Sequence, residues 1–184
     1  ERVQQAGGKV HLRCPVAKMV LNNRRVSGLV LGDGRLHSCD HVVSTMPLTL
    51  LARQLAPLPG DAAQAIDALT FRNTILVYLH VDAPNLFPDQ WLYVHSPDLG
   101  TGRVSNFRNW VPELYGDAKT TILVLEYWCY DQDPIWSAPD DTLTALATQE
   151  IRSTGLLHNA KVLDGHVHRI KRCYPVYRQG YKEH

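Results

Sequence analysis

The stretch Asp40-His-Val-Val-Ser-Thr-Met-Pro47 divides the chain into two parts of different character. Its adjacent valines predict a strand over Asp40–Thr45 that is buried on both faces, because a half-exposed strand would alternate apolar and polar residues. Pro47 has the fixed φ of a first helical residue, and the leucine-rich run through Leu55 predicts a helix. We therefore expect a buried strand that leads directly into a helix.

The part before this stretch consists of short apolar runs separated by turn signals, which is typical of an antiparallel meander. The runs are Lys9–Cys14, Ala17–Leu21, Val26–Leu31 and Arg35–Ser38. Asn22-Asn23 and Gly32-Asp33-Gly34 between them tolerate the positive φ of tight hairpin turns. The pattern predicts a three-stranded ribbon, preceded by a helical turn over Glu1–Ala6 that Gly7-Gly8 ends.

The part after Pro47 mixes strand and helix patterns. A short helix is predicted from Asp61 through Leu69, and the acidic pair Asp140-Asp141 begins a helix of about four turns that Gly155 ends. Strands are predicted at Thr74–Val81, Gln90–His95, Arg103–Arg108, Thr120–Tyr130 and Val162–Cys173. The fold class that follows is α+β, a largely antiparallel β-sheet with flanking helices plus a small β meander.

The length and composition limit the classes of protein. The 184 residues are enough for one good core or two small ones, and we expect a β meander over residues 1–47 and a larger α+β region over residues 48–184. The net charge of +1 argues against a nucleic-acid partner. No leader and no run of 18 apolar residues is present, so we expect no membrane span and a cytoplasmic location. The cysteines lack metal-site spacing, and no metal is expected.

Candidate binding residues lie in the second part. Side chains alternate along a strand, so Tyr127 and Cys129 share one face, and Glu126, Trp128 and Tyr130 share the other. One face could line a pocket for a flat or apolar substrate, although ordinary core aromatics would give the same pattern. Glu126 inside an apolar strand needs a partner, so it is expected to be an ion-pair member or a pocket residue.

Two arginines are further candidates. Arg108 and Arg172 could each pair with an anionic group of a substrate, and a structural or surface ion pair is the alternative for both.

Two ordered series of motifs resemble FAD-dependent oxidoreductases, the superfamily of protoporphyrinogen oxidase, monoamine oxidase, phytoene desaturase and UDP-galactopyranose mutase. The first series is Gly8–Val16, Arg25–Val30, Gly34 and Cys39–Pro47. The second series is Asn106–Trp110, Pro112-Glu113, Leu125–Cys129, Asp133, Trp136, Asp164-Gly165, Tyr174–Tyr177 and Gly180-Tyr181. Their order is the basis of the resemblance, which covers most of the chain.

The resemblance implies roles for particular residues. It places the backbone of Val16 against the adenine of FAD and Thr45, Met46 and Pro47 near the same cofactor. The residues proposed for substrate binding from their own chemistry are Arg108, Trp110, Glu126, Tyr127, Tyr174 and Tyr177. No catalytic residue is assigned.

The family's N-terminal GxGxxG, whose backbone amides hold the pyrophosphate of FAD, is absent from this sequence. We therefore expect the chain to be the middle, substrate-binding segment of a flavoenzyme. FAD would bind to the intact protein, and this segment alone is expected to hold none and to be inactive.

Three functions remain open on this basis. The first is an oxidoreductase of the protoporphyrinogen oxidase or amine oxidase type, which acts on a small molecule. The second is a non-redox flavoenzyme similar to UDP-galactopyranose mutase, and the third is a non-catalytic α+β binding module. If the surface that faces the FAD domain is open, we also expect self-association through it.

Overall fold

The structure is a computed structural model that describes residues 2–55 and 57–179. The chain forms two compact units: the first ends at Ala68, and the second spans Leu69–Gln179. The predicted boundary near Pro47 concerns function and stays a prediction. The structural boundary lies later in the chain, because the first unit includes the two helices that follow Pro47. The predicted α+β class is confirmed, because both sheets are antiparallel and helices accompany them.

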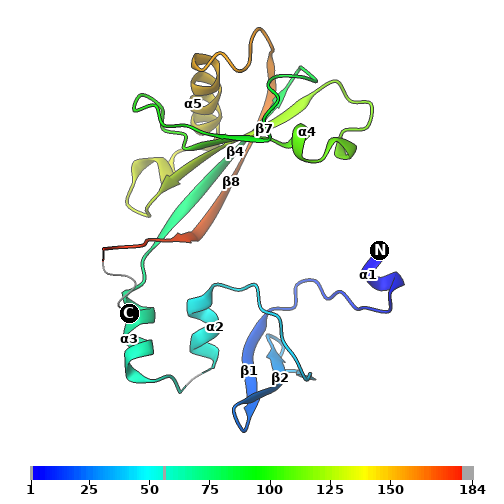
Figure 1. Ribbon diagram of the computed structural model, residues 1–184, viewed down its shortest axis with the longest axis vertical. Helices are drawn as coiled ribbons and strands as arrows, with labels where there is room; N and C mark the ends of the chain where they lie inside the picture. The colour runs from blue at the N-terminus through cyan, green and yellow to red at the C-terminus, as the bar shows by residue number, and fades with distance from the viewer. Residues whose placement is uncertain (1, 56, 180–184) are drawn as a thin grey trace. The chain divides into compact units, whose positions relative to one another are not determined.

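The first unit contains the predicted three-stranded ribbon, formed by β1 (Val16–Asn22), β2 (Arg25–Leu31) and β3 (Leu36–Ser38) in that order (Figure 1). It follows a short helix, α1 (Arg2–Gln5), which ends at Gly7 with a φ of 81°. The strand expected at Lys9–Cys14 is wrong, because β1 begins only at Val16 and pairs with β2.

The prediction for Asp40–Thr45 is also wrong, since this segment forms no strand. A strand needs a neighbour for its backbone hydrogen bonds, and no described segment pairs with this one. Burial is absent as well: Val43 is 95% exposed. The helix after it does form, as α2 (Leu48–Gln54), with Pro47 as its N-cap and not its first residue.

A second helix, α3 (Gly60–Ala68), completes the first unit and agrees with the prediction. Its first turn includes Asp61, whose carboxylate accepts the N–H of Ala62 at 2.9 Å. An exposed ion pair joins α2 to α3, with 2.6 Å between Arg53 Nη2 and Asp67 Oδ1.

The second unit is built on a five-stranded antiparallel sheet in the order β5-β6-β7-β4-β8. The strands are β4 (Phe71–Val81), β5 (Trp91–Tyr93), β6 (Arg103–Asn106), β7 (Thr121–Cys129) and β8 (Val162–Pro175). All five were predicted. Two short 3-10 helices, η1 (Pro112–Leu114) and η2 (Pro134–Ser137), lie in the connections.

Strand β6 is shorter than predicted because a helix interrupts it. The side chain of Asn106 accepts the backbone N–H of Arg108 at 3.2 Å and caps α4 (Phe107–Trp110). An asparagine at this position satisfies one of the N–H groups that a helix leaves open at its start, so the chain turns out of the sheet there.

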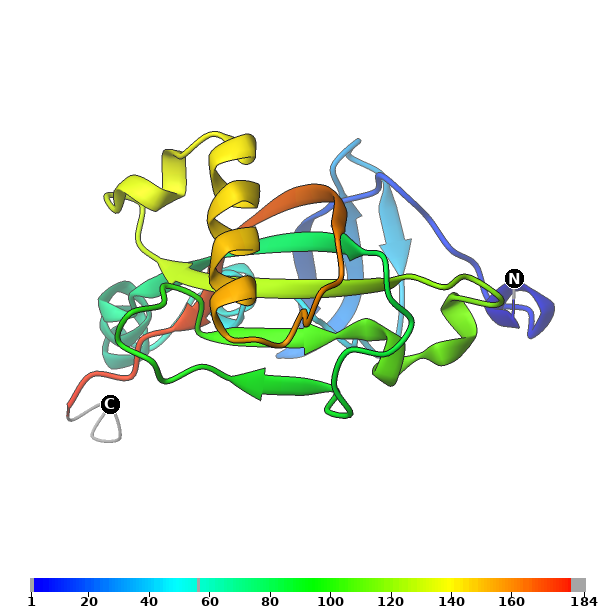
Figure 2. The ribbon, with the colours of Figure 1, turned by 90° about the horizontal axis from the view of Figure 1, so that it is seen from above.

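The long helix α5 (Asp140–Ser153) lies across one face of the five-stranded sheet (Figure 2). Its buried residues Leu143, Ala147 and Ile151 pack against the strands. The strand residues of this core include Ile75, Val77, Leu79, Leu123, Leu125 and Tyr127. Because side chains alternate along each strand, the residues between these point to the opposite face.

Candidate functional site

The face of the five-stranded sheet opposite α5 brings two of the predicted substrate residues, Glu126 and Tyr174, together with further aromatic and charged side chains. We call this surface the aromatic face and define it by Arg72, Trp91, Tyr93, Arg103, Glu126, Trp128 and Tyr174. Cross-strand register sets these residues beside one another: Tyr93 pairs with Arg103, and Arg103 pairs with Glu126. All five strands therefore place charged and aromatic groups on a single surface.

An ion pair between Arg103 and Glu126 forms the polar part of this face. Arg103 Nε donates to one carboxylate oxygen of Glu126 and Nη2 to the other, each at 2.8 Å. The glutamate side chain is only 8% exposed and the arginine 26%. Burial alone would lower the pKa of Arg103, but the hydrogen bonds and charge of Glu126 outweigh it and raise that pKa.

Aromatic rings surround this pair. Tyr93 lies with its ring centroid 6.5 Å from that of Trp128, and Trp128 meets Tyr174 edge to face at 6.5 Å. Arg103 lies over the Tyr93 ring and also donates to the hydroxyl of Tyr174 at 3.3 Å. The face thus combines a hydrogen-bonded charge pair with rings that can contact a flat molecule.

The indole of Trp128 lies directly against the backbone of Gly102. A Cβ at this glycine would meet ring atom Cζ3 at 2.1 Å, which is far inside contact distance. The absence of a side chain at Gly102 is therefore what lets the indole lie flat on the sheet.

A second hydrogen-bond network supports the site from the other side of the sheet. The buried carboxylate of Glu150, on α5, accepts from the N–H of Gly100 at 2.7 Å, the N–H of Thr101 at 3.0 Å and the Tyr127 hydroxyl at 2.9 Å. The Thr101 hydroxyl in turn bonds to the carbonyl of Glu126 at 3.3 Å. This network fixes the loop that leads into Arg103.

Two other predicted substrate residues, Tyr127 and Arg108, do not belong to the aromatic face. Tyr127 faces α5, where burial first and the Glu150 carboxylate second raise its pKa, so it is not brought together with Glu126. Arg108 donates to the carbonyls of Ala118 and Thr120.

The remaining three predicted residues are distributed as follows. Trp110, on α4, donates its indole N–H to the carbonyl of Gln90 at 3.0 Å. Tyr177 follows β8 and is exposed, whereas Tyr174 belongs to the aromatic face. The second arginine considered, Arg172, lies over the ring of Phe71 at 4.2 Å.

Sequence reasoning missed Arg72, Tyr93 and Arg103 as members of the aromatic face. Glu126 was expected to need a partner, but the partner is on a different strand. Its identity depends on the pairing register between β6 and β7, which no local pattern in the sequence specifies. The alternation of side chains along the strand correctly predicted that Trp128 and Glu126 share one face of the sheet.

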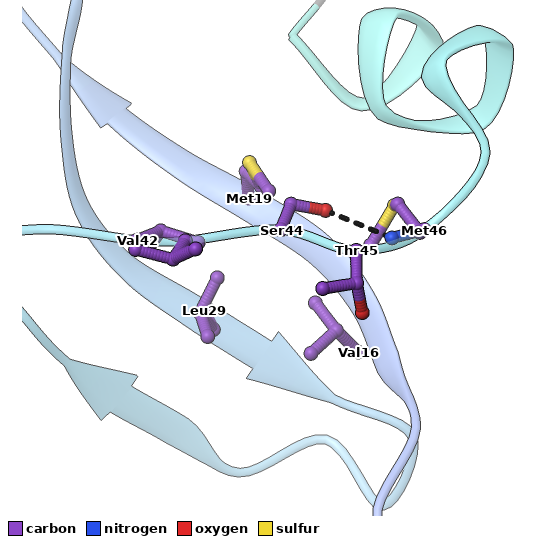
Figure 3. Close-up of a pocket in the computed structure, with 8 residues that line it drawn as sticks. Val16, Met19, Leu29, Val42, Ser44, Thr45 and Met46 are labelled. Atoms are coloured by element: carbon purple, nitrogen blue, oxygen red, sulfur yellow. Dashed lines mark hydrogen bonds between the residues drawn. The ribbon is translucent and has the colours of Figure 1, made fainter. Parts of the chain in front are cut away.

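The predicted cofactor residues meet in the first unit. Val16, Thr45 and Met46 line one hollow of about 340 Å³, together with Met19, Leu29 and Val42 to Ser44 (Figure 3). Ser44 Oγ accepts the backbone N–H of Met46 at 3.3 Å and bends the segment there. Pro47 does not line the hollow; it caps α2 directly after it.

The extended segment beside this hollow has unused backbone groups. Among the hydrogen bonds of the described residues, none involves the backbone N–H or C=O of Val42, Val43 or Thr45. The hollow therefore offers apolar side chains beside free backbone donors and acceptors, and this combination suits the edge and faces of a heteroaromatic ring such as adenine. The described residues provide no matching glycine-rich loop for a pyrophosphate.

In the described part of the chain, no group of three or more His, Cys, Asp or Glu side chains is placed to hold a metal ion. None of the described helices has the length and apolar content that a membrane crossing requires. All four cysteines are unpaired.

Several larger solved structures contain this combination of a β meander and an antiparallel sheet backed by one helix. Reduced UDP-galactopyranose mutase is 20% identical with a TM-score of 0.64, and the alignment covers 85% of this chain and 35% of that one. A protein assigned as a protoporphyrinogen oxidase, from Exiguobacterium sp. 255-15, is 16% identical with a TM-score of 0.61, covering 94% and 37%. A putrescine oxidase variant is 15% identical with a TM-score of 0.62, covering 90% and 36%.

These structures share the fold of the chain, and its class, that of flavin-containing oxidoreductases, follows from a match to a family model. The family described as flavin containing amine oxidoreductase matches residues 1–181, and the chain belongs to this family. A comparison with curated proteins found no match. The chain spans little more than a third of the length of the solved structures that it resembles.

Proposed function

We propose that this chain is the substrate-binding segment of an FAD-dependent oxidoreductase, and that its substrate lies on the aromatic face. The observation that carries the proposal is the buried Arg103–Glu126 pair surrounded by Tyr93, Trp128 and Tyr174 on one sheet surface. The chain belongs to a family of flavin-containing oxidoreductases, and a surface of this kind could hold a substrate for flavin chemistry. The active protein is proposed to be longer than the chain, as its relatives are.

The aromatic face would bind and orient a substrate, while the bound flavin supplies the redox chemistry. The rings of Tyr93 and Trp128 offer flat apolar contact, and ring stacking excludes water from the bound molecule. The Arg103–Glu126 pair would keep the neighbouring Tyr93 and Tyr174 rings in position for the substrate, because both partners are hydrogen-bonded and belong to neighbouring strands. The Glu150 network keeps the adjoining loop in place.

The first unit is proposed to contact the adenine end of FAD. Val16, Thr45 and Met46 would line that contact, and Pro47 would direct the chain away from it into α2. The unpaired backbone of Val42 to Thr45 is available for the cofactor or for a strand of an FAD-binding domain. Residues for the pyrophosphate would come from outside this segment.

The complete gene product tests the proposal. It should purify with a flavin absorbance spectrum or acquire one with added FAD. Tyr93→Ala and Trp128→Phe should raise the KM for the substrate by about tenfold with unchanged flavin content, since each change removes contacts to the bound molecule. Trp136→Phe is the matched control, because Trp136 packs against the core that faces α5.

Failure to bind FAD at all would overturn the flavoenzyme assignment. If the protein binds flavin but substitutions on the aromatic face leave KM unchanged, the substrate binds at another site.

A mutase-type reaction is the second candidate, favoured by the two arginines on the aromatic face and by the fold shared with UDP-galactopyranose mutase. A uridine sugar nucleotide should then protect the complete protein against thermal unfolding without net flavin reduction by the substrate. Flavin reduction by an amine or a porphyrinogen would favour the oxidase reaction instead.

A further inference from the structure

Three buried polar atoms on the strands of the aromatic face have no hydrogen-bond partner among the described residues: Arg72 Nε, Thr74 Oγ1 and Trp128 Nε1. A buried polar group without a partner is rare in folded proteins and costs free energy, so each one requires an explanation. Three such groups in one place indicate that something outside the described chain satisfies them.

The three residues that carry these atoms are neighbours in space on β4 and β7. Thr74 and Trp128 are direct cross-strand partners on β4 and β7. Arg72 lies two positions before Thr74 on the same strand, and its guanidinium lies 5.9 Å from the centre of the Trp128 ring. Strand alternation therefore turns all three side chains to the same face.

The chemistry of these atoms defines what they can bind. The guanidinium Nε–H and the indole N–H can only donate, and the threonine hydroxyl can donate or accept. A group that satisfies all three must therefore present oxygen acceptors.

The local charge selects among oxygen acceptors. Glu126 neutralises Arg103, and no ion pair within the described residues involves Arg72. The positive charge of Arg72 is therefore uncompensated beside two neutral donors, which favours an anion over a neutral carbonyl.

We propose that Arg72, Thr74 and Trp128 form a binding site for an anionic oxygen group of the substrate, a carboxylate or a phosphate. The inference rests on the proposed function, in which this face holds the substrate, and it adds the substrate's chemical class. A substrate whose reactive part is an amine would then also carry an acid group.

Tyr93 lies beside Trp128 and is 52% exposed, and its ring contacts Trp91, Trp128 and Arg103. The Arg103–Glu126 pair beside it stays closed, so an incoming anion meets Arg72 and not Arg103.

The test uses the indole N–H signal of Trp128 in two-dimensional proton–nitrogen spectra of this chain, assigned by its loss in Trp128→Phe. Benzoate and inorganic phosphate, added separately, identify the type of anion, and benzylamine is the cationic counterpart of benzoate. We expect a saturable downfield shift with at least one anion and none with benzylamine. Arg72→Gln should weaken that binding by about ten- to a hundredfold, as expected for a lost charge-assisted hydrogen bond.

Two further variants distinguish a loss of the binding site from a loss of folding. Arg152→Gln, on α5, should leave the affinity unchanged. Thr74→Val should weaken binding severalfold while leaving stability unchanged or higher, because it removes an unpaired buried hydroxyl from the free protein.

An absent shift with both anions, equal affinity in Arg72→Gln, or a shift with benzylamine of the same size would overturn the inference. Its failure is distinguishable from failure of the proposed function: flavin binding by the complete protein does not depend on this titration. Flavin binding without anion binding removes only the anion site.

Discussion

Arg103 on β6 and Glu126 on β7 form a two-point ion pair across neighbouring strands, with both hydrogen bonds at 2.8 Å. The Glu126 side chain is largely buried and both of its carboxylate oxygens accept from Arg103, which distinguishes this pair from the exposed pair of Arg53 and Asp67 in the first unit. This difference in burial gives the first prediction.

Glu126→Gln should destabilise the chain by about 1–3 kcal/mol, because it leaves the largely buried guanidinium of Arg103 without its counter-charge. Urea unfolding followed by circular dichroism measures the change. The control is Asp67→Asn, which breaks an exposed pair and should change stability by less than about 1 kcal/mol. Equal effects of the two substitutions would contradict the structural importance of the Arg103–Glu126 pair.

Tyr127 should make stability sensitive to alkaline pH. Its folded-state pKa is raised, by burial first and by Glu150 second, whereas the unfolded tyrosine titrates at about 10. Above that pH the folded state binds more protons than the unfolded state, so stability is complete below about pH 10 and falls as the pH rises.

Tyr127→Phe should therefore flatten the decline in unfolding free energy between about pH 9 and 11, by up to about 1.4 kcal/mol per pH unit. Denaturant titrations at a series of pH values measure this. Some decline should persist through Cys129, whose thiol pKa is raised mainly by burial. Parallel curves for the two proteins would show that the Tyr127 phenol does not contribute.

Gly102→Ala should displace the Trp128 indole and destabilise the second unit by about 1–3 kcal/mol, because the new Cβ overlaps the ring. Near-ultraviolet circular dichroism and denaturant unfolding report the two effects. Gly60→Ala is the matched control: a Cβ there meets nothing within 4 Å, so stability should be unchanged or slightly higher. An unaltered Trp128 signal in Gly102→Ala would refute the contact.

Self-association should occur through exposed apolar residues of the first unit. Val43 is 95% exposed, and Leu12, Leu36 and Leu48 are also exposed. Light scattering should show a mass that rises with concentration, and Val43→Lys should reduce that rise, since a charge on an unpaired extended segment opposes pairing. A constant monomer mass at high concentration would exclude this association.

Much of the fold follows from local sequence pattern. The β meander, both helices after Pro47, the four-turn helix and all five strands of the second sheet were predictable, because each depends on short-range periodicity and turn residues. The errors concern interactions with distant segments. Asp40–Thr45 has strand-forming residues but no described partner strand. Asn106 ends β6 because its side chain caps α4, and in the sequence it looks the same as an asparagine inside a strand.

The sequence by itself determined the superfamily, the α+β class and the side of β7 to which Glu126 and Trp128 point, since alternation is a property of every strand. Only the tertiary structure decided that Arg103 is the partner of Glu126, that Tyr127 belongs to the core with Glu150, and that Arg72 stacks on Trp128. The physical reason is that strand register joins residues far apart in the chain, and that register depends on burying one face of several strands at once, which no single segment specifies.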